Sequence, residues 1–373
     1  MKRSLGPGRN TRARWSRPLV LSCLAALAAA LAVACAPAPM PKAAPPPAPG
    51  SVPRVVPRPT NCTRSLSDAT SAQQALDQAT PGQRVCIFGQ YVQGATLRLG
   101  KSGTPQAPIQ LQSDGSTLST LRIQADNVVV EGFNTNGGNG IKARGSNITL
   151  RNNDVRGASD DGIRCAPCVN SMVDNNTVKD SDGTGILIDG QGVTAQNNDV
   201  SGSRRIAATD ADGMRFFGIN MKLLNNNVHD ISQRGYPAGQ EPHTDCFQTF
   251  DSDSPLTYGV IIQQNKCVNV DAQCLIASGT ERHNAGVPNG QVAIQFLDNY
   301  CQSGADQAVY LEGYPNVVVR GNTFSAQYST AVLAVQGAIN VKINDNTMVG
   351  QFEPYQVDDV SRQGFDESNN QNK

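Results

Sequence analysis

Short runs in which apolar and polar side chains alternate recur along the chain from residue 120 onward. Alternation with a period of two predicts β-strands that bury one face. Two such runs flank one position that holds asparagine in every repeat, and successive asparagines are 22 to 39 residues apart. This asparagine column comprises Asn153, Asn176, Asn198, Asn226, Asn265, Asn299, Asn322 and Asn346.

A repeat of this length predicts one coil of a parallel β-helix. It is too short for helical solenoid repeats, which need about 33 residues or more, and it lacks the leucine spacing of leucine-rich repeats. Coils cannot bury their inner face alone, so they stack at about 4.8 Å. Inward-directed asparagines can hydrogen-bond their equivalents above and below, and asparagine tolerates left-handed backbone. We therefore expect an all-β fold, a parallel β-helix of about 9–11 coils over residues 61–350, with a polar cap or tail at 351–373.

The segment before the repeats predicts an N-terminal cap. Residues 71–80 have the spacing of a short amphipathic helix, Pro81 and Gly82 end it, and residues 85–91 are strand-like. Together with the run Gly-Thr-Pro-Gln-Ala-Pro-Ile at 103–109, this block resembles the cap and first coil of right-handed parallel β-helix proteins of the pectin-lyase-like superfamily. The resemblance covers residues 61–350 and implies a fold, not one particular reaction.

A second aligned column marks the outward face of one strand in each coil. In every repeat a turn residue is followed by a small residue, then an apolar residue, then a fourth residue that alternation directs outward. This outward file consists of Lys142, Arg164, Leu187, Arg215, Gln248, Ile276, Tyr310 and Leu333. The turn residues Asp161, Asp212 and Asp245 are predicted to reach solvent, with Asp212 and Asp245 about 5 Å apart on consecutive coils.

Insertions flank this strand on the middle coils. They lie at residues 201–211, 231–241, 251–257 and 278–290 and account for the longest intervals between asparagines. Loops of this kind would wall a groove over a rigid strand floor. The polar candidates in this region also include His229, His243, His283, Arg204, Arg205, Arg234, Asp210, Asp251, Asp253 and Glu281.

Charge becomes informative once the N-terminus is separated from the rest. The 373 residues hold 31 basic and 31 acidic side chains. Residues 1–34 contain six basic residues, no acidic residue, an apolar run and then small residues, which is typical of a secretory signal peptide. Its removal leaves 25 basic and 31 acidic groups. A net charge of about −6 and few aromatic residues disfavour nucleic acid as a partner.

A membrane anchor is also predicted. The segment Leu-Ala-Val-Ala-Cys at residues 31–35 resembles a bacterial lipobox, which implies acylation of Cys35. Cleavage without lipidation of Cys35 is the alternative. Residues 35–60 are rich in Pro and Ala and cannot build a core, so we expect an extended linker. The chain is thus predicted to be a monomeric cell-envelope lipoprotein or secreted protein that touches a membrane only through its lipid.

Cysteine usage agrees with export. Eight cysteines remain besides Cys23 and Cys35, and an even number in an exported chain predicts disulfides. The alignment places two pairs of cysteines in shared slots on consecutive coils, within bridging distance. Four bridges are expected: Cys246 with Cys274, Cys267 with Cys301, Cys62 with Cys86, and Cys165 with Cys168.

The segment His-Thr-Asp-Cys-Phe-Gln at residues 243–248 holds the densest group of candidate catalytic side chains. It resembles the Asn-Thr-Asp-Gly entry to the catalytic strand of β-helix polygalacturonases and the His-x-Asp segments of some alginate-acting β-helices. The aspartate pair, Gly-His-Gly and Arg-Ile-Lys of polygalacturonases are missing from the following coils, which disfavours that activity. The predicted catalytic residues are His243, Asp245, Asp212 and Arg215, and the predicted substrate-binding residues are Lys142, Arg164, Arg204, Arg205, Gln248 and Tyr310.

Three functions remain open. A lyase or uronate epimerase for an anionic polysaccharide would neutralise the sugar carboxylate with arginines and move protons through His243 or Tyr310. A glycoside hydrolase would use Asp212 and Asp245 as a carboxylate pair. If the aspartates only cap turns, the protein is a glycan-binding or envelope-structural β-helix. Basic residues beside the acids favour the lyase, and Asp212 with Asp245 is also a candidate calcium site.

Overall fold

The computed structural model describes residues 56–89, 94–208, 210–251, 257–279, 287–288 and 290–373. The predicted signal peptide, Cys35 and most of the linker lie outside the described residues, as do Asp253, Glu281 and His283. Among the described residues, no helix is both long and apolar enough to span a membrane.

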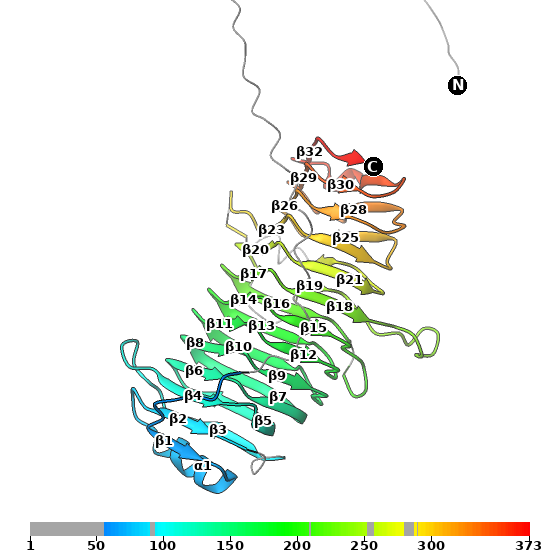
Figure 1. Ribbon diagram of the computed structural model, residues 1–373. Coiled ribbons are helices and arrows are strands. Elements are labelled where there is room, and N and C mark those ends of the chain that lie inside the picture. The colour runs from blue at the N-terminus through cyan, green and yellow to red at the C-terminus, as the bar shows by residue number, and fades with distance from the viewer. Residues whose placement is uncertain (1–55, 90–93, 209, 252–256, 280–286, 289) are drawn as a thin grey trace, which may run out of the picture. The chain divides into compact units, whose positions relative to one another are not determined.

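Each coil contributes one strand to a 13-stranded parallel sheet (Figure 1). This number exceeds the 9–11 coils expected, because the first coils lack the ladder asparagine by which coils were counted and a further coil lies in the predicted tail. The strands are β1 (Arg64–Leu66), β2 (Arg84–Ile87), β4 (Ile109–Ser113), β6 (Val128–Glu131), β8 (Ile148–Arg151), β11 (Met172–Asp174), β14 (Thr194–Gln196), β17 (Lys222–Leu224), β20 (Val260–Gln263), β23 (Ile294–Leu297), β26 (Val317–Arg320), β29 (Lys342–Asn344) and β32 (Asp366–Ser368).

The other strands form two parallel files, which β5 and β7 join by bending from one to the other. The first file, called the site file below, is β3 (Thr96–Leu99), β5 (Thr117–Gln124), β7 (Asn134–Ser146), β10 (Ile163–Val169), β13 (Ile186–Gln191), β16 (Met214–Ile219), β19 (Phe247–Phe250), β22 (Leu275–Ser278), β25 (Gln307–Glu312), β28 (Thr330–Val335) and β31 (Glu353–Val357). The second is β9 (Asp154–Arg156), β12 (Thr177–Lys179), β15 (Asp199–Ser201), β18 (Asn227–Ile231), β21 (Lys266–Val270), β24 (Tyr300–Ser303), β27 (Thr323–Phe324), β30 (Thr347–Met348) and β33 (Gln371–Asn372).

A short helix covers the first coil, as the sequence predicted. Helix α1 (Ala69–Asp77) begins after Asp68, whose carboxylate accepts the backbone N–H of Ser71 at 2.8 Å and caps the helix. Its buried face packs Leu76 and two alanines against the open end of the solenoid. The apolar ends of strands inside the coils would otherwise be exposed there, so the helix closes the core.

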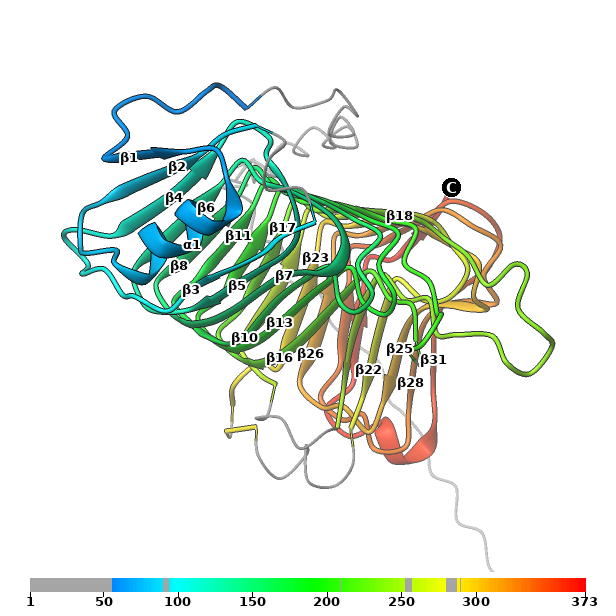
Figure 2. The same ribbon diagram turned by 90° about the horizontal axis from the view of Figure 1, so that it is seen from below.

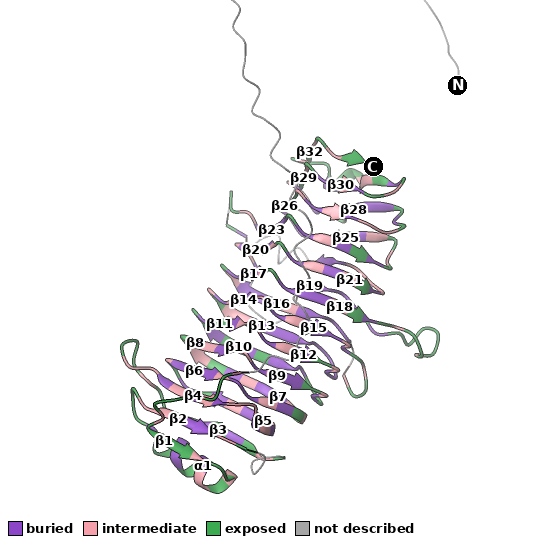
Figure 3. Ribbon diagram, in the orientation of Figure 1, coloured by how far each residue is buried: buried purple, intermediate pink, exposed green. Residues whose placement is uncertain are grey.

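The core lies inside the coils, and on many strands buried residues alternate with more exposed ones (Figure 3). On β6 and β8, for example, the exposure alternates between buried and half-buried residues. Stacking brings equivalent apolar residues into contact, as in the register pairs Val130 with Leu150 and Val319 with Ile343. The period-two pattern of the sequence therefore corresponds directly to the inside and outside of the coils.

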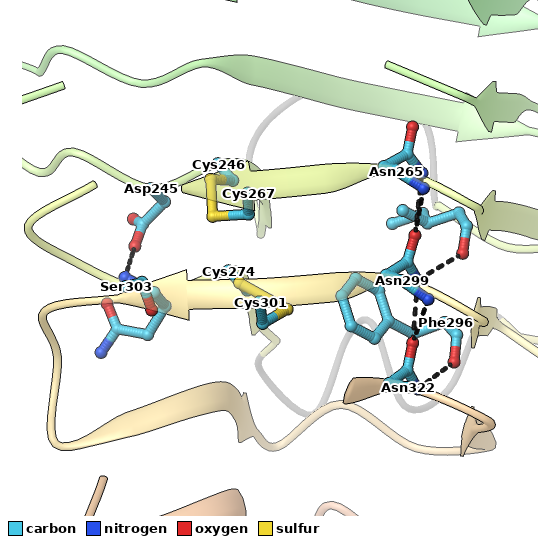
Figure 4. Close-up of a disulfide and its surroundings, with 12 residues drawn as sticks. Asp245, Cys246, Asn265, Cys267, Cys274, Phe296, Asn299, Cys301, Ser303 and Asn322 are labelled. Atoms are coloured by element: carbon cyan, nitrogen blue, oxygen red, sulfur yellow. Dashed lines mark hydrogen bonds between the residues drawn. A yellow bond between two sulfur atoms is a disulfide. The ribbon is translucent and has the colours of Figure 1, made fainter. Parts of the chain in front are cut away.

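The asparagine column forms a continuous buried ladder. In each step the side-chain Oδ1 accepts both the backbone N–H and the Nδ2–H of the equivalent residue one coil earlier. Asn176, for example, donates both groups to Asn198 at 3.0 Å, and its Nδ2 also donates to the carbonyl of Leu150. All eight predicted asparagines are buried, and Figure 4 shows the steps from Asn265 through Asn299.

The left-handed backbone of the turn belongs to the residue before each ladder asparagine. Asn175 and Asn197, which precede Asn176 and Asn198, have φ near +57° and +55°. Asparagine is among the few residues that tolerate this region, and its side chain can hydrogen-bond locally. The Asn-Asn pairs of the sequence thus divide two tasks, the first residue turning the chain and the second joining the coils.

The β-helix continues past the boundary predicted at residue 350. Strands β31, β32 and β33 pair in register with the previous coil, and Asn346 donates to Asn370, which adds a ninth ladder asparagine. The prediction of a tail at 351–373 is therefore wrong, because these residues form a further coil. Its polar outward residues concealed the inward ones, such as Phe352 and Val357.

The described residues contain four disulfides, and two of the four predicted pairings are wrong. Cys62 bonds Cys86 and Cys165 bonds Cys168, as predicted. The remaining four cysteines form bridges within single coils instead of between coils (Figure 4). Those bridges join Cys246 to Cys267 and Cys274 to Cys301.

The predicted register was correct, because Cys267 and Cys301 are direct partners on β21 and β24. The error lay in side-chain direction. Residues stacked in register point the same way, so their Cβ atoms stay about 4.8 Å apart, farther than the roughly 3.8 Å that a disulfide prefers. Inward side chains from two faces of one coil converge, and that geometry permits the bridge.

Removing one ladder asparagine should destabilise the fold measurably. Asn198→Leu leaves the backbone N–H of Asn176, and one of the two N–H groups on its Nδ2, without an acceptor in a buried site. We expect the free energy of unfolding to fall by about 3 kcal/mol, measured by urea denaturation. Gln196→Leu, a half-buried neighbour on β14, is the matched control and should change it by less than about 0.5 kcal/mol. Equal effects of the two variants would contradict the ladder's role.

Peptide mapping under non-reducing conditions tests the cysteine pairing. Digestion between the cysteines should release a fragment linking Cys246 to Cys267 and another linking Cys274 to Cys301. Fragments linking Cys246 to Cys274 would show that the bridges run between coils.

Candidate functional site

The strand register confirms that the members of the outward file stack on one another, but Leu187, Gln248 and Ile276 are buried instead of exposed as predicted. Each of its members pairs directly with the next across neighbouring strands of the site file. The register extends the file at its N-terminal end to Arg98 and Arg122 and at its C-terminal end to Gln356. Figure 2 shows strands of the site file side by side.

Carboxylates of neighbouring coils hold the loops that precede β16 and β19. Asp182 is nearly buried and accepts the backbone N–H groups of three successive residues, 206–208. Asp271 accepts Ser232 Oγ and the N–H of Gln233 in the next loop. The sequence analysis missed both aspartates, because nothing in an isolated Asp distinguishes a loop-holding residue from an exposed one.

The predicted position of the aspartate column is wrong. Asp161, Asp212 and Asp245 were expected to reach solvent, but they are 6%, 0% and 0% exposed. Their Oδ1 atoms point along the stack and accept a backbone N–H of the next coil. Asp212 Oδ1, for example, accepts the N–H of Asp245 at 2.9 Å. A residue that closes a turn meets the unpaired N–H of the following coil, so its carboxylate satisfies that donor instead of water.

The second oxygen of each aspartate faces the outward file. Asp212 Oδ2 accepts Arg215 Nε at 2.7 Å, and Asp210 Oδ2 accepts Nη2 of the same arginine at 2.6 Å. Arg215 is 14% exposed and lies over the ring of Phe250. Its guanidinium is therefore fixed by two carboxylates and an aromatic face, and its charge is largely balanced.

On the next coil the equivalent aspartate faces a histidine. Asp245 Oδ2 lies 3.8 Å from His243 Nδ1 and 3.3 Å from Gln248 Nε2. The His243 side chain is 61% exposed, in contrast to the buried carboxylate behind it. The Asp245 carboxylate raises the pKa of His243 to about 9, so the imidazole is a strong base whenever it is neutral.

The two buried carboxylates have altered proton affinity. Burial raises the pKa of Asp212 to about 7, opposed by the charge of Arg215 and reinforced by Asp245. Burial also raises the pKa of Asp245, opposed by His243 and by the N–H of Gln273. Both carboxylates on these adjacent coils therefore hold a proton more readily than an ordinary aspartate, a property found at functional sites.

The structure gathers five predicted site residues into one cluster and leaves the others apart. Asp212, Arg215, His243, Asp245 and Gln248 contact one another across β16 and β19. This group, together with Asp210, is called the central cluster below.

The remaining predicted residues lie elsewhere on the molecule. Tyr310 lies two coils farther along the file. Arg204 is exposed, and Arg205 donates to the carbonyl of Gln240 and so joins the two loops. His229 lies on β18 in the second file, between Asp199 and Asp230. Lys142 and Arg164 lie on β7 and β10, several coils toward the N-terminus.

The donor set of the central cluster does not suit calcium. Calcium takes six to eight oxygen ligands, whereas the oxygens of Asp212 and Asp245 are engaged by backbone N–H groups, Arg215 and Gln248. No group of three metal-binding side chains exists among the residues that the structure describes.

Comparisons with known proteins support the fold. Residues 113–285 match the family model for a right handed beta helix region. A search of curated proteins found no match to the chain.

Solved structures similar to this chain are carbohydrate-active enzymes of low sequence identity. A GH87 alpha-1,3-glucanase from Streptomyces thermodiastaticus aligns with TM-score 0.59 and 13% identity, covering 86% of this chain and 70% of that one. A PL6 family polysaccharide lyase from Pseudopedobacter saltans aligns with TM-score 0.51 and 12% identity, covering 83% of this chain and 92% of that one. The A-module of an Azotobacter vinelandii mannuronan C-5 epimerase aligns with TM-score 0.50 and 14% identity, covering 82% of this chain and 94% of that one. The chain is thus a right-handed parallel β-helix whose structural neighbours include hydrolases, lyases and an epimerase.

Proposed function

We propose that this protein is an exported enzyme that acts on an anionic polysaccharide as a lyase or uronate epimerase, with the central cluster as its active site. The observation that carries the proposal is the exposed imidazole of His243, backed by the buried carboxylate of Asp245 and beside the fixed guanidinium of Arg215 on the adjacent coil. Export is supported by four disulfides, which form in oxidising compartments. Anchoring through a lipid on Cys35 is part of the same proposal.

Each residue has a proposed role in an elimination reaction. Neutral His243 removes the proton at C5 of a uronate, next to its carboxylate, and Asp245 stabilises the imidazolium that forms. Arg215 stabilises, in this proposal, the negative charge that develops on the sugar carboxylate. The C4–O bond then breaks, a C4–C5 double bond forms, and the imidazolium returns its proton to the departing oxygen. Epimerisation requires instead that C5 regain a proton from the opposite face.

A hydrolase is the second candidate, and one observation favours it. Asp212 has a raised pKa of about 7 and shares its stack with Asp245 on the adjacent coil. A carboxylic acid that keeps its proton near neutral pH is suited to protonate a leaving group, and a spacing of about 5 Å suits retention of configuration. Both carboxylates are fully buried, however, whereas His243 reaches solvent.

Product analysis separates the candidate functions. The purified protein is incubated with polygalacturonate, alginate and glycosaminoglycans, and absorbance of unsaturated uronates is followed alongside new reducing ends. The proposal predicts unsaturated products and a loss of about 10²-fold or more in His243→Ala, with His229→Ala within about twofold of wild type as the matched control. Reducing ends without unsaturation favour the hydrolase. Binding without turnover favours a glycan-binding protein, and an active His243→Ala variant would remove His243 from the mechanism.

The pH profile tests which group takes the proton. If neutral His243 is the base, kcat/KM rises with pH and levels off near pH 9, where the imidazole loses its proton. Asp245→Asn removes the charge that raises the pKa of His243, so that the pKa should fall toward the ordinary 6.5. Histidine NMR titration of both proteins measures this shift. A rate that falls above pH 7 would follow Asp212 instead and support the hydrolase.

A further inference from the structure

A basic pocket lies on the site file, on the N-terminal side of the central cluster. It has a volume of about 270 Å³ and opens over β5, β7 and β10, which lie side by side in Figure 2. Its charged lining consists of Arg122, Lys142, Arg144, Arg164 and Asp160. Four cations therefore face one pocket with a single carboxylate among its lining residues.

Internal ion pairs account for only half of this positive charge. Lys142 Nζ lies 3.0 Å from Asp160, and Arg164 Nη1 lies 3.1 Å from Asp161. Neither Arg122 nor Arg144 forms an ion pair with a residue that the structure describes. The central cluster differs in this respect, since Arg215 there is held by two carboxylates.

In the absence of a bound anion, the placement of these cations destabilises the folded protein. Arg98, Arg122, Lys142 and Arg164 occupy the same outward position on four consecutive coils. Like charges directly opposite on neighbouring strands destabilise a sheet. The Nε of Arg122 is also buried without a hydrogen-bond partner among the described residues. An anion in the pocket would relieve the repulsion and accept from that donor.

We propose that this basic pocket is a separate anion-binding subsite, which holds a carboxylate or sulfate group of the polysaccharide away from the bond that reacts. The inference rests on the proposed function for the identity of the polymer, but not for the existence of the site. Guanidinium groups bind carboxylate and sulfate oxygens through paired N–H donors, which suits both ligands. The half-exposed Arg164 and the exposed Arg144 are accessible to such a group.

The register also fixes how far the subsite lies from the central cluster. Arg164 and Arg215 are separated by two coil steps, with Leu187 between them, and Arg122 lies two steps beyond Arg164. At about 4.8 Å per coil, Arg164 lies roughly 10 Å and Arg122 roughly 19 Å from Arg215 along the file. A polysaccharide lying along the site file would therefore need several sugar residues to reach both places, so the pocket anchors chains and does not bind single sugars tightly.

Affinity electrophoresis tests the subsite without requiring turnover. The full-length protein is run through gels containing polygalacturonate, heparin or a neutral glucan. Wild type should be retarded by an anionic polymer and not by the glucan. The double variant Arg122→Gln/Arg144→Gln should bind that polymer at least about tenfold more weakly. The double variant Arg64→Gln/Arg320→Gln, which changes two exposed arginines on β1 and β26 of the 13-stranded sheet, is the charge-matched control for nonspecific attraction and should bind like wild type.

The outcomes distinguish this inference from the proposed function. Asp245→Asn should lose turnover and keep its retardation, because Asp245 is not part of the pocket. Retardation of the double variant equal to wild type overturns the subsite even if the wild type is active. Weakened binding by the double variant supports the subsite even if no turnover is found. Retention by polygalacturonate alone identifies a carboxylate ligand, and retention by heparin alone identifies a sulfate ligand.

A turnover measurement adds a second criterion if the enzyme is active. For wild type, kcat/KM should rise with oligosaccharide length until the chain spans the pocket and the central cluster. The double variant should show a flatter dependence while retaining the wild-type rate on the shortest substrates. Equal loss on short and long substrates would mean that the arginines act through the fold and would overturn the subsite.

Discussion

Register between successive coils is the constraint on which the rest of this structure depends. Parallel strands stacked at about 4.8 Å place equivalent residues of each repeat directly above one another. The asparagine ladder holds this register from inside the turn, because every Oδ1 accepts two donors of the preceding coil. A slip of one residue would reverse inside and outside along a strand and would leave these buried donors unpaired.

The same register creates the central cluster. Asp212 and Asp245 occupy one slot on adjacent coils, and each uses one oxygen to bind the next coil's backbone and the other to face the outward file. The two interpretations of these aspartates, turn-closing residue and reactive carboxylate, are therefore compatible. Burial that satisfies the backbone also raises their pKa values, and it leaves His243 as the exposed member of the group.

Charge is distributed unevenly along the site file. The N-terminal coils present more cations than carboxylates, the middle coils hold a balanced cluster of arginine, aspartates and histidine, and the later coils present Tyr310 and Leu333. A polymer lying on such a surface would be bound electrostatically by the N-terminal coils and would react at the middle coils. Separation of binding from reaction is how remote contacts contribute to catalysis.

The sequence by itself determined the coil, the outward file and the cap, because a period of two and a recurring asparagine are local properties of the chain. It also predicted that Asp212 neighbours Asp245 and that Arg215 neighbours Gln248, since residues in one slot must stack. It could not determine the direction of a side chain at a turn. The buried Asp212, the bridge of Cys246 with Cys267 and the loop-holding Asp182 were decided by donors and partners that other segments supply. Only the closed coils bring those groups together, because side-chain direction there follows from contacts across the coil and not from alternation along it.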